Sequence, residues 1–187
     1  PKPGAKEAIA DLKARGIKTV MISGDNRGAA EAMARRLGLD PAAGEVMSEV
    51  LPGDKAALIS KLKEGDKNVV LMVGDGVNDA PALAAADVGM AMTNADGGGT
   101  DVAMHAAGIT LMRGDPMLVA AALDISAKTV AKIRQNLFWA FAYNVAGIPL
   151  AALGYLNPVV AGAAMALSSV SVMSNALLLK RWKPKSK

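Results

Sequence analysis

A long run without ionisable side chains limits what this chain can fold into more than any other feature. Between Arg134 and Lys180 there is no Asp, Glu, Lys, Arg or His, which makes a run of 45 residues (179 − 134). About 20 apolar residues cross a bilayer as an α-helix, so the run has room for two membrane-spanning helices and a turn. Asn157-Pro158 is a turn signal near its middle, and it predicts spans at 136–156 and 159–179. A buried helical hairpin in a water-soluble protein is the alternative.

Basic residues flank the uncharged run on both sides. They are Lys128, Lys132 and Arg134 before it, and Lys180, Arg181, Lys183, Lys185 and Lys187 after it. Because basic segments beside membrane spans stay in the cytoplasm, we expect both ends of the chain there, with Trp139 and Trp182 as interfacial anchors. These flanks largely explain the net charge of +4, so nucleic-acid binding is not expected. The chain has no cysteine, which excludes disulfides and zinc–thiolate sites.

The part before the uncharged run alternates between strand-like and helix-like segments, which predicts an α/β fold with a parallel sheet. Expected strands lie at 17–22, 45–50, 69–73, 88–92 and 109–112. Expected helices lie at 6–15, 29–37, 54–62, 81–86, 100–106 and 116–134. The last of these is expected to run directly into the first membrane span. The glycine-rich segment 93–99 is expected to be a surface loop.

The run Gly74-Asp75-Gly76-Val77-Asn78-Asp79-Ala80-Pro81 follows the expected strand 69–73. Open α/β sheets bind their ligands at the carboxyl ends of strands, where this run lies. The glycines Gly74 and Gly76 let the backbone turn tightly beside an anion. Asp75 and Asp79 supply the hard oxygen ligands that Mg²⁺ takes when it is shared with a phosphate. The run therefore indicates a magnesium and phosphoryl site, with an ordinary strand–turn–helix connection as the alternative.

The same run resembles the hinge motif of the P-type ATPases, a branch of the haloacid-dehalogenase-like phosphotransferases. The resemblance covers essentially the whole chain and extends to the heavy-metal, copper(I)-exporting type. It implies a partial haloacid-dehalogenase-like parallel sheet followed by a two-helix transmembrane hairpin. The implied parts are the second half of a phosphorylation domain at 1–115, a stalk helix at 116–134, two membrane helices at 135–180 and a basic cytoplasmic tail at 181–187. The implied location is a plasma or inner membrane.

The resemblance also assigns roles to individual residues. Ser23-Gly24-Asp25 ends the first strand as Gly74-Asp75 ends the later one, and it stands where the family has Thr-Gly-Asp. Its hydroxyl and backbone N–H groups are expected to bind phosphate oxygens. Lys55 is expected to neutralise the phosphoryl group, and Asn78 to hydrogen-bond it. Asp75 and Asp79 are expected to hold Mg²⁺ directly or through water.

The family forms an aspartyl-phosphate on an Asp-Lys-Thr-Gly motif, and this chain has no such motif. We therefore expect the chain to be inactive alone and to act with the N-terminal part of the same pump, which would bind most of the ATP. Lacking the first strand, the sheet is expected to keep an exposed edge at its centre. Membrane lipid and a copper chaperone donor are the other implied partners.

In the membrane part, Tyr143-Asn144 and Met165-Ala166-Leu167-Ser168-Ser169 look like the last two helices of copper(I) exporters. Met165 and Ser169 are four residues apart and share a helix face. A thioether suits Cu⁺, and Ag⁺ equally well, so Tyr143, Asn144, Met165 and Ser169 are the predicted transport ligands. Helix–helix packing and hydrogen bonding are the alternative roles. The Cys-Pro-Cys ligands of the family are absent.

Two other functions remain open at this stage. A membrane-anchored phosphatase of the same fold would need a nucleophilic Asp before the first strand, and only Asp11 is available there, inside a helical pattern. A non-catalytic regulatory segment that binds Mg²⁺ and other transporter segments is the second. The sequence encoded upstream of Pro1 would separate these.

Overall fold

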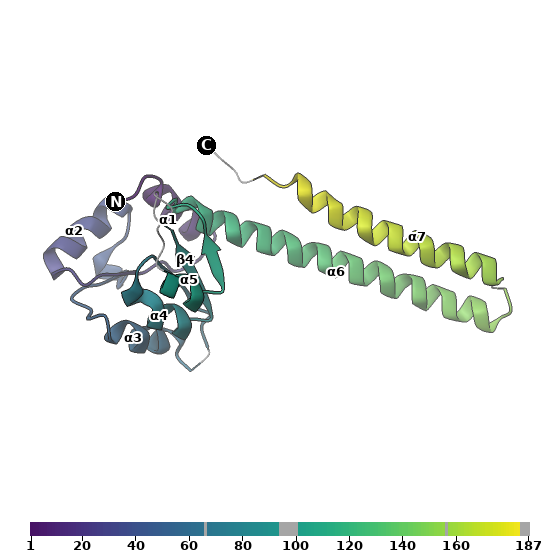
Figure 1. Ribbon diagram of the computed structural model, residues 1–187, viewed down its shortest axis with the longest axis horizontal. Helices are drawn as coiled ribbons and strands as arrows, with labels where there is room; N and C mark the ends of the chain where they lie inside the picture. Colours follow the sequence, from purple (N-terminus) through teal and green to yellow (C-terminus); the bar gives the residue numbers. More distant parts are fainter. Residues whose placement is uncertain (66, 94–100, 156, 184–187) are drawn as a thin grey trace. The chain divides into compact units, whose positions relative to one another are not determined.

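The computed structural model describes residues 1–65, 67–93, 101–155 and 157–183. The chain forms two compact units, Pro1–Ala120 and Ala121–Lys187 (Figure 1). Most of the glycine-rich segment 93–99 and the end of the basic tail, with Lys185 and Lys187, lie outside the described residues.

The first unit is built from alternating strands and helices, as the sequence predicts. Its strands are β1 (Met21–Ile22), β2 (Val46–Met47), β3 (Leu71–Gly74), β4 (Val88–Met92) and β5 (Ile109–Leu111). Its helices are α1 (Ala5–Ala14), α2 (Arg27–Leu37), α3 (Asp54–Lys63), α4 (Ala80–Ala85) and α5 (Asp101–Ala106), with the 3₁₀ turns η1 (Pro41–Ala43) and η2 (Val77–Asp79). The predicted strands at 17–22 and 45–50 shorten to two residues each, because only those residues pair.

All strand pairings in this unit are parallel, but they make two sheets instead of the expected one. The strands β1 and β2 form one sheet, and β3, β4 and β5 form the other in that order. Among the described residues, no strand pairs with the free edge of β1 or with that of β3. The expectation of a single parallel sheet is therefore wrong in detail. The strands β1 and β3, which precede the turns at Gly24 and Gly74, do not pair in one sheet.

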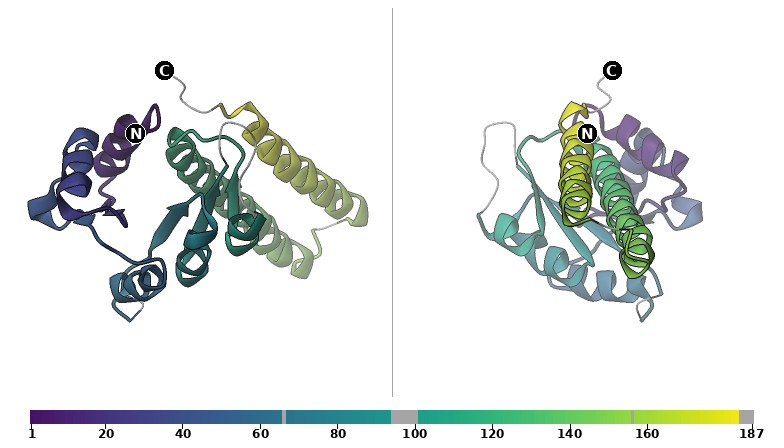
Figure 2. Two further views of the ribbon diagram at one scale, coloured as in Figure 1. Left: turned by 60° about the vertical axis from the view of Figure 1, so that its left-hand side comes forward. Right: turned by 90° about the vertical axis from the view of Figure 1, so that its right-hand side faces the viewer.

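The helices α3, α4 and α5 follow one another along one side of the β3–β4–β5 sheet (Figure 2). The core beneath them contains Leu83 and Ala103 from the helices and Ala91 from the central strand, all about 1% exposed. Gly89 allows the close approach of α4 to β4, since a Cβ there would lie 2.7 Å from the Leu83 carbonyl oxygen. This packing fixes α4, and with it the turn that joins β3 to α4.

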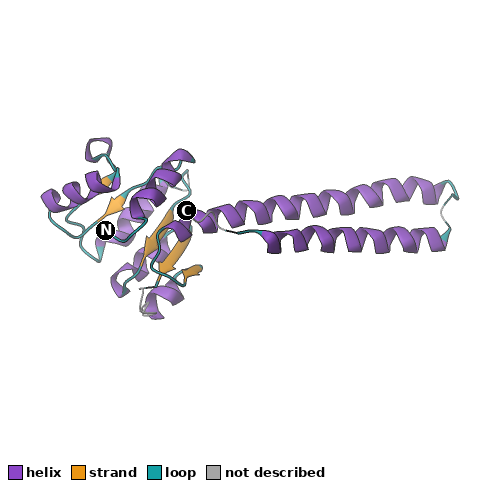
Figure 3. Ribbon diagram, turned by 90° about the horizontal axis from the view of Figure 1, so that it is seen from above, coloured by secondary structure: helices purple, strands orange, loops and turns teal. Residues whose placement is uncertain are grey.

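The second unit is an antiparallel helical hairpin (Figure 3). Helix α6 (Met117–Ala152) begins in the last residues of the first unit, and α7 (Pro158–Leu177) leads into the 3₁₀ turn η3 (Leu178–Arg181). The Nζ of Lys132 donates to the Oδ1 of Asn175 at 2.6 Å, and the indole Nε1 of Trp182 donates to the Oδ2 of Asp124 at 2.8 Å. These contacts bring the two basic flanks to the same end of the hairpin.

Within the described residues, one helical segment is long and apolar enough to cross a membrane, Pro158–Arg181. It corresponds to the second predicted span. The predicted first span lies in α6, where Gln135, Asn136 and Asn144 make the helix more polar, and its passage through a membrane stays a prediction. This helix also ends four residues before the predicted boundary at 156, because Gly154 adopts a φ of 76° and turns the chain.

Candidate functional site

A pocket of about 280 Å³ lies in the first unit, at the carboxyl end of β3. The carboxyl ends of β1, β3 and β4, the turn after β3, the start of α3 and the N-terminal segment line it. The lining residues are Lys2, Ile22, Lys55, Met72, Val73, Gly74, Asp75, Asp79 and Met92. Both β1, through Ile22, and β3, through Gly74, reach this pocket. The carboxyl ends of β1 and β3 therefore meet at one pocket, although the two strands belong to different sheets.

Gly74 is required for the geometry of the turn after β3. A Cβ at this position would lie 2.7 Å from the Cβ of Asp79 and 2.9 Å from its carboxyl carbon. Contacts that close do not occur, so the absence of a side chain at 74 allows the Asp79 carboxylate to fold back over the strand end. The Gly76 N–H donates to Asp79 Oδ2 at 3.4 Å and holds it there.

Lys55 lies opposite that carboxylate. Its Nζ is 2.7 Å from Asp79 Oδ1, and the two side chains are only 17% and 15% exposed. Lys55 stands in the first turn of α3, and Asp79 ends η2, so two separate helical segments place the ion pair. Because both side chains are largely shielded from water, solvent screens their mutual attraction poorly.

Asp75 is paired with a residue that the sequence did not single out. Lys2 Nζ lies 3.2 Å from Asp75 Oδ2, with side-chain exposures of 38% and 48%, and 3.8 Å from Met92 Sδ. No local sequence pattern predicts this ion pair, because 73 residues separate the two partners. The pocket thus contains two carboxylates and two lysines.

This donor set fits a magnesium ion shared with a phosphate. Mg²⁺ uses one or two carboxylates and completes its shell with water and phosphate oxygens, which is what Asp75 and Asp79 offer. Within the described residues there is no group of three or more Asp, Glu, His or Cys that could hold a metal without such help. The pocket therefore suits a metal that arrives with its anionic substrate.

The Ser23 turn forms its own hydrogen-bonded cluster. Ser23 Oγ donates to Asp25 Oδ2 at 2.9 Å and accepts from the Asp25 N–H at 3.1 Å. Ser23, Gly24 and Asp25 are not among the pocket-lining residues, and the side chain of Asn78 is exposed in η2. Their predicted contacts with a phosphoryl group stay predictions.

The four predicted transport ligands lie on the two helices of the second unit. Asn144 Nδ2 donates to the Ala140 carbonyl at 2.8 Å, and Ser169 Oγ donates to the Met165 carbonyl at 3.1 Å. Asn175 bonds Asn136 across the hairpin at 2.7 Å. In an antiparallel hairpin, a step of eight residues along α6 from Asn136 to position 144 corresponds to eight residues back along α7, from Asn175 to position 167 (175 − 8). Positions 144 and 167 therefore lie at the same level. Tyr143, Asn144, Met165 and Ser169 thus share one level of the hairpin, and their role as ligands stays a prediction.

Comparison with known proteins relates both units to one class of transporter. A family model of haloacid dehalogenase-like hydrolases matches residues 1–87. Over 97% of its length, the chain is 57% identical to a copper-exporting P-type ATPase of Staphylococcus haemolyticus. Over 96% of its length, it is 56% identical to the protein of that name from Staphylococcus aureus. The chain spans 22% and 21% of the lengths of these two relatives.

Solved structures agree with these matches. A zinc-transporting PIB-type ATPase in its E2.Pi state aligns with 96% of this chain at 37% identity and a TM-score of 0.84, and 28% of that structure is covered. The catalytic domain of the CPx-ATPase CopB-B aligns with 59% of this chain at 40% identity and a TM-score of 0.50, with 40% of that structure covered. The fold of the first unit is thereby that of a haloacid-dehalogenase-like domain, as predicted.

Proposed function

The chain belongs to the P-type ATPase family, and from that membership we propose that it works as part of an ATP-driven copper(I) export pump. In this proposal the first unit supplies the magnesium- and phosphoryl-binding end of the phosphorylation domain. The second unit supplies two helices of the membrane domain. Copper export is the activity of the named relatives. We extend it to this chain because the chain is 57% identical to one of them over nearly its whole length.

The observation that carries the proposal is the Lys55–Asp79 pair beside Asp75 in the pocket after β3. Bound Mg²⁺ would supply positive charge beside the phosphoryl oxygens. Asp75 and Asp79 would hold that ion, and Lys55 would face the transferred phosphoryl group from α3. Phosphoryl transfer depends mainly on positioning and on charge neutralisation, which these three side chains provide.

Other parts of the proposed pump would complete the reaction. The nucleophilic Asp and most of the ATP site would come from the N-terminal part of the same pump. A strand carrying that Asp fits the free edges of β1 and β3, which the pocket already joins through Ile22 and Gly74. A phosphatase that uses Asp11 is disfavoured, since Asp11 lies in α1 and pairs with Arg15 at 2.8 Å.

The transported ion would meet the pump at the level of Tyr143, Asn144, Met165 and Ser169. Met165 offers a soft thioether, which favours Cu⁺ or Ag⁺ over hard cations. A copper chaperone would deliver the ion on the cytoplasmic side. The basic flanks, brought to one end of the hairpin, would place the first unit and both chain ends in the cytoplasm, with the pump in a plasma or inner membrane.

A chimera tests the proposal. This chain replaces the 182 aligned residues of the Staphylococcus haemolyticus copper-exporting ATPase, and membrane vesicles are assayed for ATP-dependent uptake of Cu⁺, Ag⁺ and Zn²⁺. We expect uptake of Cu⁺ and Ag⁺ but not Zn²⁺, with a phosphoenzyme formed from ATP. Asp75→Asn and Lys55→Met should each lower the rate of phosphorylation about 100-fold.

The matched control is Asp54→Asn, which removes an exposed carboxylate next to Lys55 and should leave phosphorylation unchanged. Met165→Leu should lower Cu⁺ uptake while phosphorylation from inorganic phosphate persists. A correctly inserted chimera that transports Zn²⁺ but no Cu⁺ would overturn the copper assignment. Wild-type phosphorylation in both Asp75→Asn and Lys55→Met would overturn the assignment of the pocket.

A further inference from the structure

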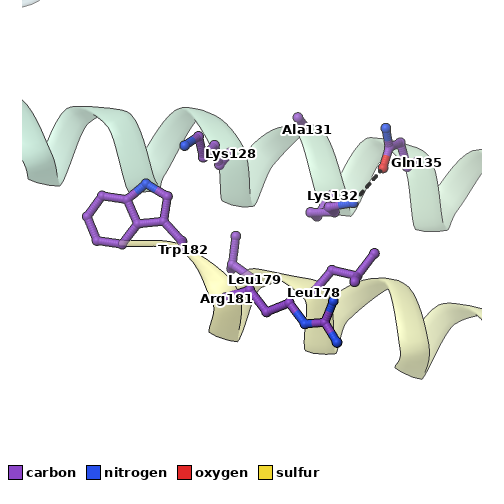
Figure 4. A pocket seen from close by; sticks show the side chains of 8 residues that line it. All are labelled: Lys128, Ala131, Lys132, Gln135, Leu178, Leu179, Arg181 and Trp182. Atoms are coloured by element: carbon purple, nitrogen blue, oxygen red, sulfur yellow. Dashed lines mark hydrogen bonds between the residues drawn. The ribbon is translucent and has the colours of Figure 1, made fainter. Parts of the chain in front are cut away.

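A second pocket, of about 310 Å³, lies inside the helical hairpin and takes no part in the proposed phosphoryl or copper chemistry. Its walls come from α6 on one side, and from η3 and the Trp182 that follows it on the other (Figure 4). The lining residues are Lys128, Ala131, Lys132, Gln135, Leu178, Leu179, Arg181 and Trp182. We propose that this pocket binds the headgroup of an anionic phospholipid.

Charge is the first reason. The second unit contains eight Lys or Arg residues and one acidic residue, Asp124, a formal net charge of +7. Asp124 pairs with Lys128 at 3.2 Å. Lys132 instead bonds the neutral oxygens of Gln135 at 3.3 Å and of Asn175 at 2.6 Å. Within the described residues no carboxylate pairs with Lys132 or with Arg181, so two positive charges in the pocket lack a counter-ion.

The walls of the pocket combine these cations with fixed apolar surface. Trp182 is held by its hydrogen bond to Asp124, and Lys128 Nζ lies 5.8 Å from the centre of the indole ring. Leu178 and Leu179 provide the aliphatic part of the wall. A soluble phosphate would gain nothing from this apolar surface, whereas the glycerol and first acyl carbons of a lipid would cover it. The chemistry therefore favours a phosphate that carries a hydrophobic tail.

The position along the chain gives the third reason. The candidate membrane span Pro158–Arg181 ends at this pocket. The end of a span that carries Lys, Arg and Trp lies at the headgroup level of a bilayer. Basic pockets between helices on the cytoplasmic side are suited to anionic headgroups. The pocket volume is at the lower end of the range for small-molecule sites, which fits one glycerophosphate headgroup. This inference does not depend on which ion is transported.

Native mass spectrometry of the full chain in a neutral detergent tests the proposal, because a neutral micelle has no surface potential to attract lipid nonspecifically. We expect one phosphatidylglycerol to bind in preference to phosphatidylcholine. The double variant Lys132→Gln/Arg181→Gln should weaken phosphatidylglycerol binding at least about tenfold, the loss expected for a charge-assisted hydrogen bond. Glycerol 3-phosphate and inorganic phosphate should fail to displace the lipid at millimolar concentration.

The matched control is Arg134→Gln/Lys183→Gln, which removes one charge from α6 and one from the segment after η3 without touching the pocket. It should bind phosphatidylglycerol as the wild type does. Equal affinity for both lipids, equal weakening in both double variants, or displacement by soluble phosphate at similar concentration would each overturn the proposal.

A fluorescence experiment on wild-type pocket residues guards against misfolded variants. In Trp139→Phe, Trp182 is the single tryptophan. Phosphatidylglycerol with brominated acyl chains should quench its emission at lower lipid concentration than brominated phosphatidylcholine does. Identical quenching curves for the two lipids would contradict a headgroup site beside Trp182.

Discussion

Lys55 and Asp79 form an ion pair of 2.7 Å whose two side chains are each less than one-fifth exposed. The pair joins the start of α3 to the turn after β3, 24 residues further on. Its partial burial makes it both a structural contact and a charged wall of the pocket. Removing one partner leaves the other charge unpaired in a site that is poorly accessible to water.

We therefore expect Lys55→Met and Asp79→Asn each to destabilise the first unit by about 1–3 kcal/mol. The double variant should cost less than the sum of both, because neither charge is then left alone. Thermal unfolding of the chain in detergent, followed by circular dichroism, measures all three. The more exposed Lys2–Asp75 pair is the comparison, and Lys2→Met should cost less than about 1 kcal/mol. Additive losses in the Lys55–Asp79 cycle would contradict the coupling.

Lys2 should compete with magnesium for Asp75. Because its ammonium lies 3.2 Å from the carboxylate, Lys2→Ala frees an oxygen ligand and should tighten Mg²⁺ binding up to about fivefold. Isothermal titration of the chain with MgCl₂ gives the dissociation constant. Lys6→Ala removes an exposed lysine of α1 that does not line the pocket, and it should leave the constant unchanged. An unchanged dissociation constant for Mg²⁺ in Lys2→Ala would contradict the binding of the metal by Asp75.

Gly74→Ala should displace the Asp79 carboxylate, since the added Cβ would lie 2.7 Å from Asp79 Cβ. We expect Mg²⁺ binding to weaken strongly and the free energy of unfolding to fall by about 1–3 kcal/mol, the usual cost of overpacking. Titration and thermal unfolding measure the two effects. At Gly53, where nothing lies within 4 Å of an added Cβ, alanine should have neither effect. Normal Mg²⁺ binding by Gly74→Ala would show that the turn tolerates a side chain.

The stability of the first unit should fall in acid partly through Asp87. The Val70 N–H donates to its carboxylate at 2.8 Å, and Lys63 Nζ lies 3.0 Å away, so both lower the pKa of Asp87 below the usual 3.8. A lowered folded-state pKa contributes stability that is present above the unfolded pKa and is lost as pH falls through the folded value. The melting temperature between pH 6 and 2 should therefore drop less steeply in Asp87→Asn.

Lys63→Met provides a graded version of the same test. It removes the contribution of Lys63 and keeps the Val70 hydrogen bond, so its pH profile should lie between those of the wild type and Asp87→Asn. A profile for Asp87→Asn that parallels the wild type would assign the acid sensitivity to other carboxylates. Glu45 is the next candidate, because hydrogen bonds from Lys13 and from the Asp40 N–H lower its pKa as well.

The local part of this site could be predicted from the sequence. The Gly74–Pro81 run places two carboxylates within one turn, so their position after β3 follows from spacing alone. The helix that continues from the first unit into the uncharged run was also predictable, because no glycine or proline interrupts residues 117–146. Boundaries of α1, α2 and α3 agree with the predicted ranges within two residues, and Asn26 caps the start of α2 by accepting from the Ala29 N–H.

The parts that could not be predicted depend on distant pairs. Lys2 reaches Asp75 across 73 residues, and the first glycine turn, at Gly24, lies on a sheet of its own. Strand periodicity shows which face of a strand is buried but not which strand lies beside it. The pocket at Lys132 and Arg181 has the same origin, since a hairpin contact between Asn175 and Asn136 sets the register.

The unpaired edges of β1 and β3 have a consequence for handling the chain by itself. Each presents backbone N–H and C=O groups that no other described strand satisfies. A free strand edge can pair with a strand of another molecule. The chain expressed alone should therefore self-associate by strand pairing between molecules as its concentration rises. A synthetic peptide that pairs with the free edges of β1 and β3 should keep it monomeric.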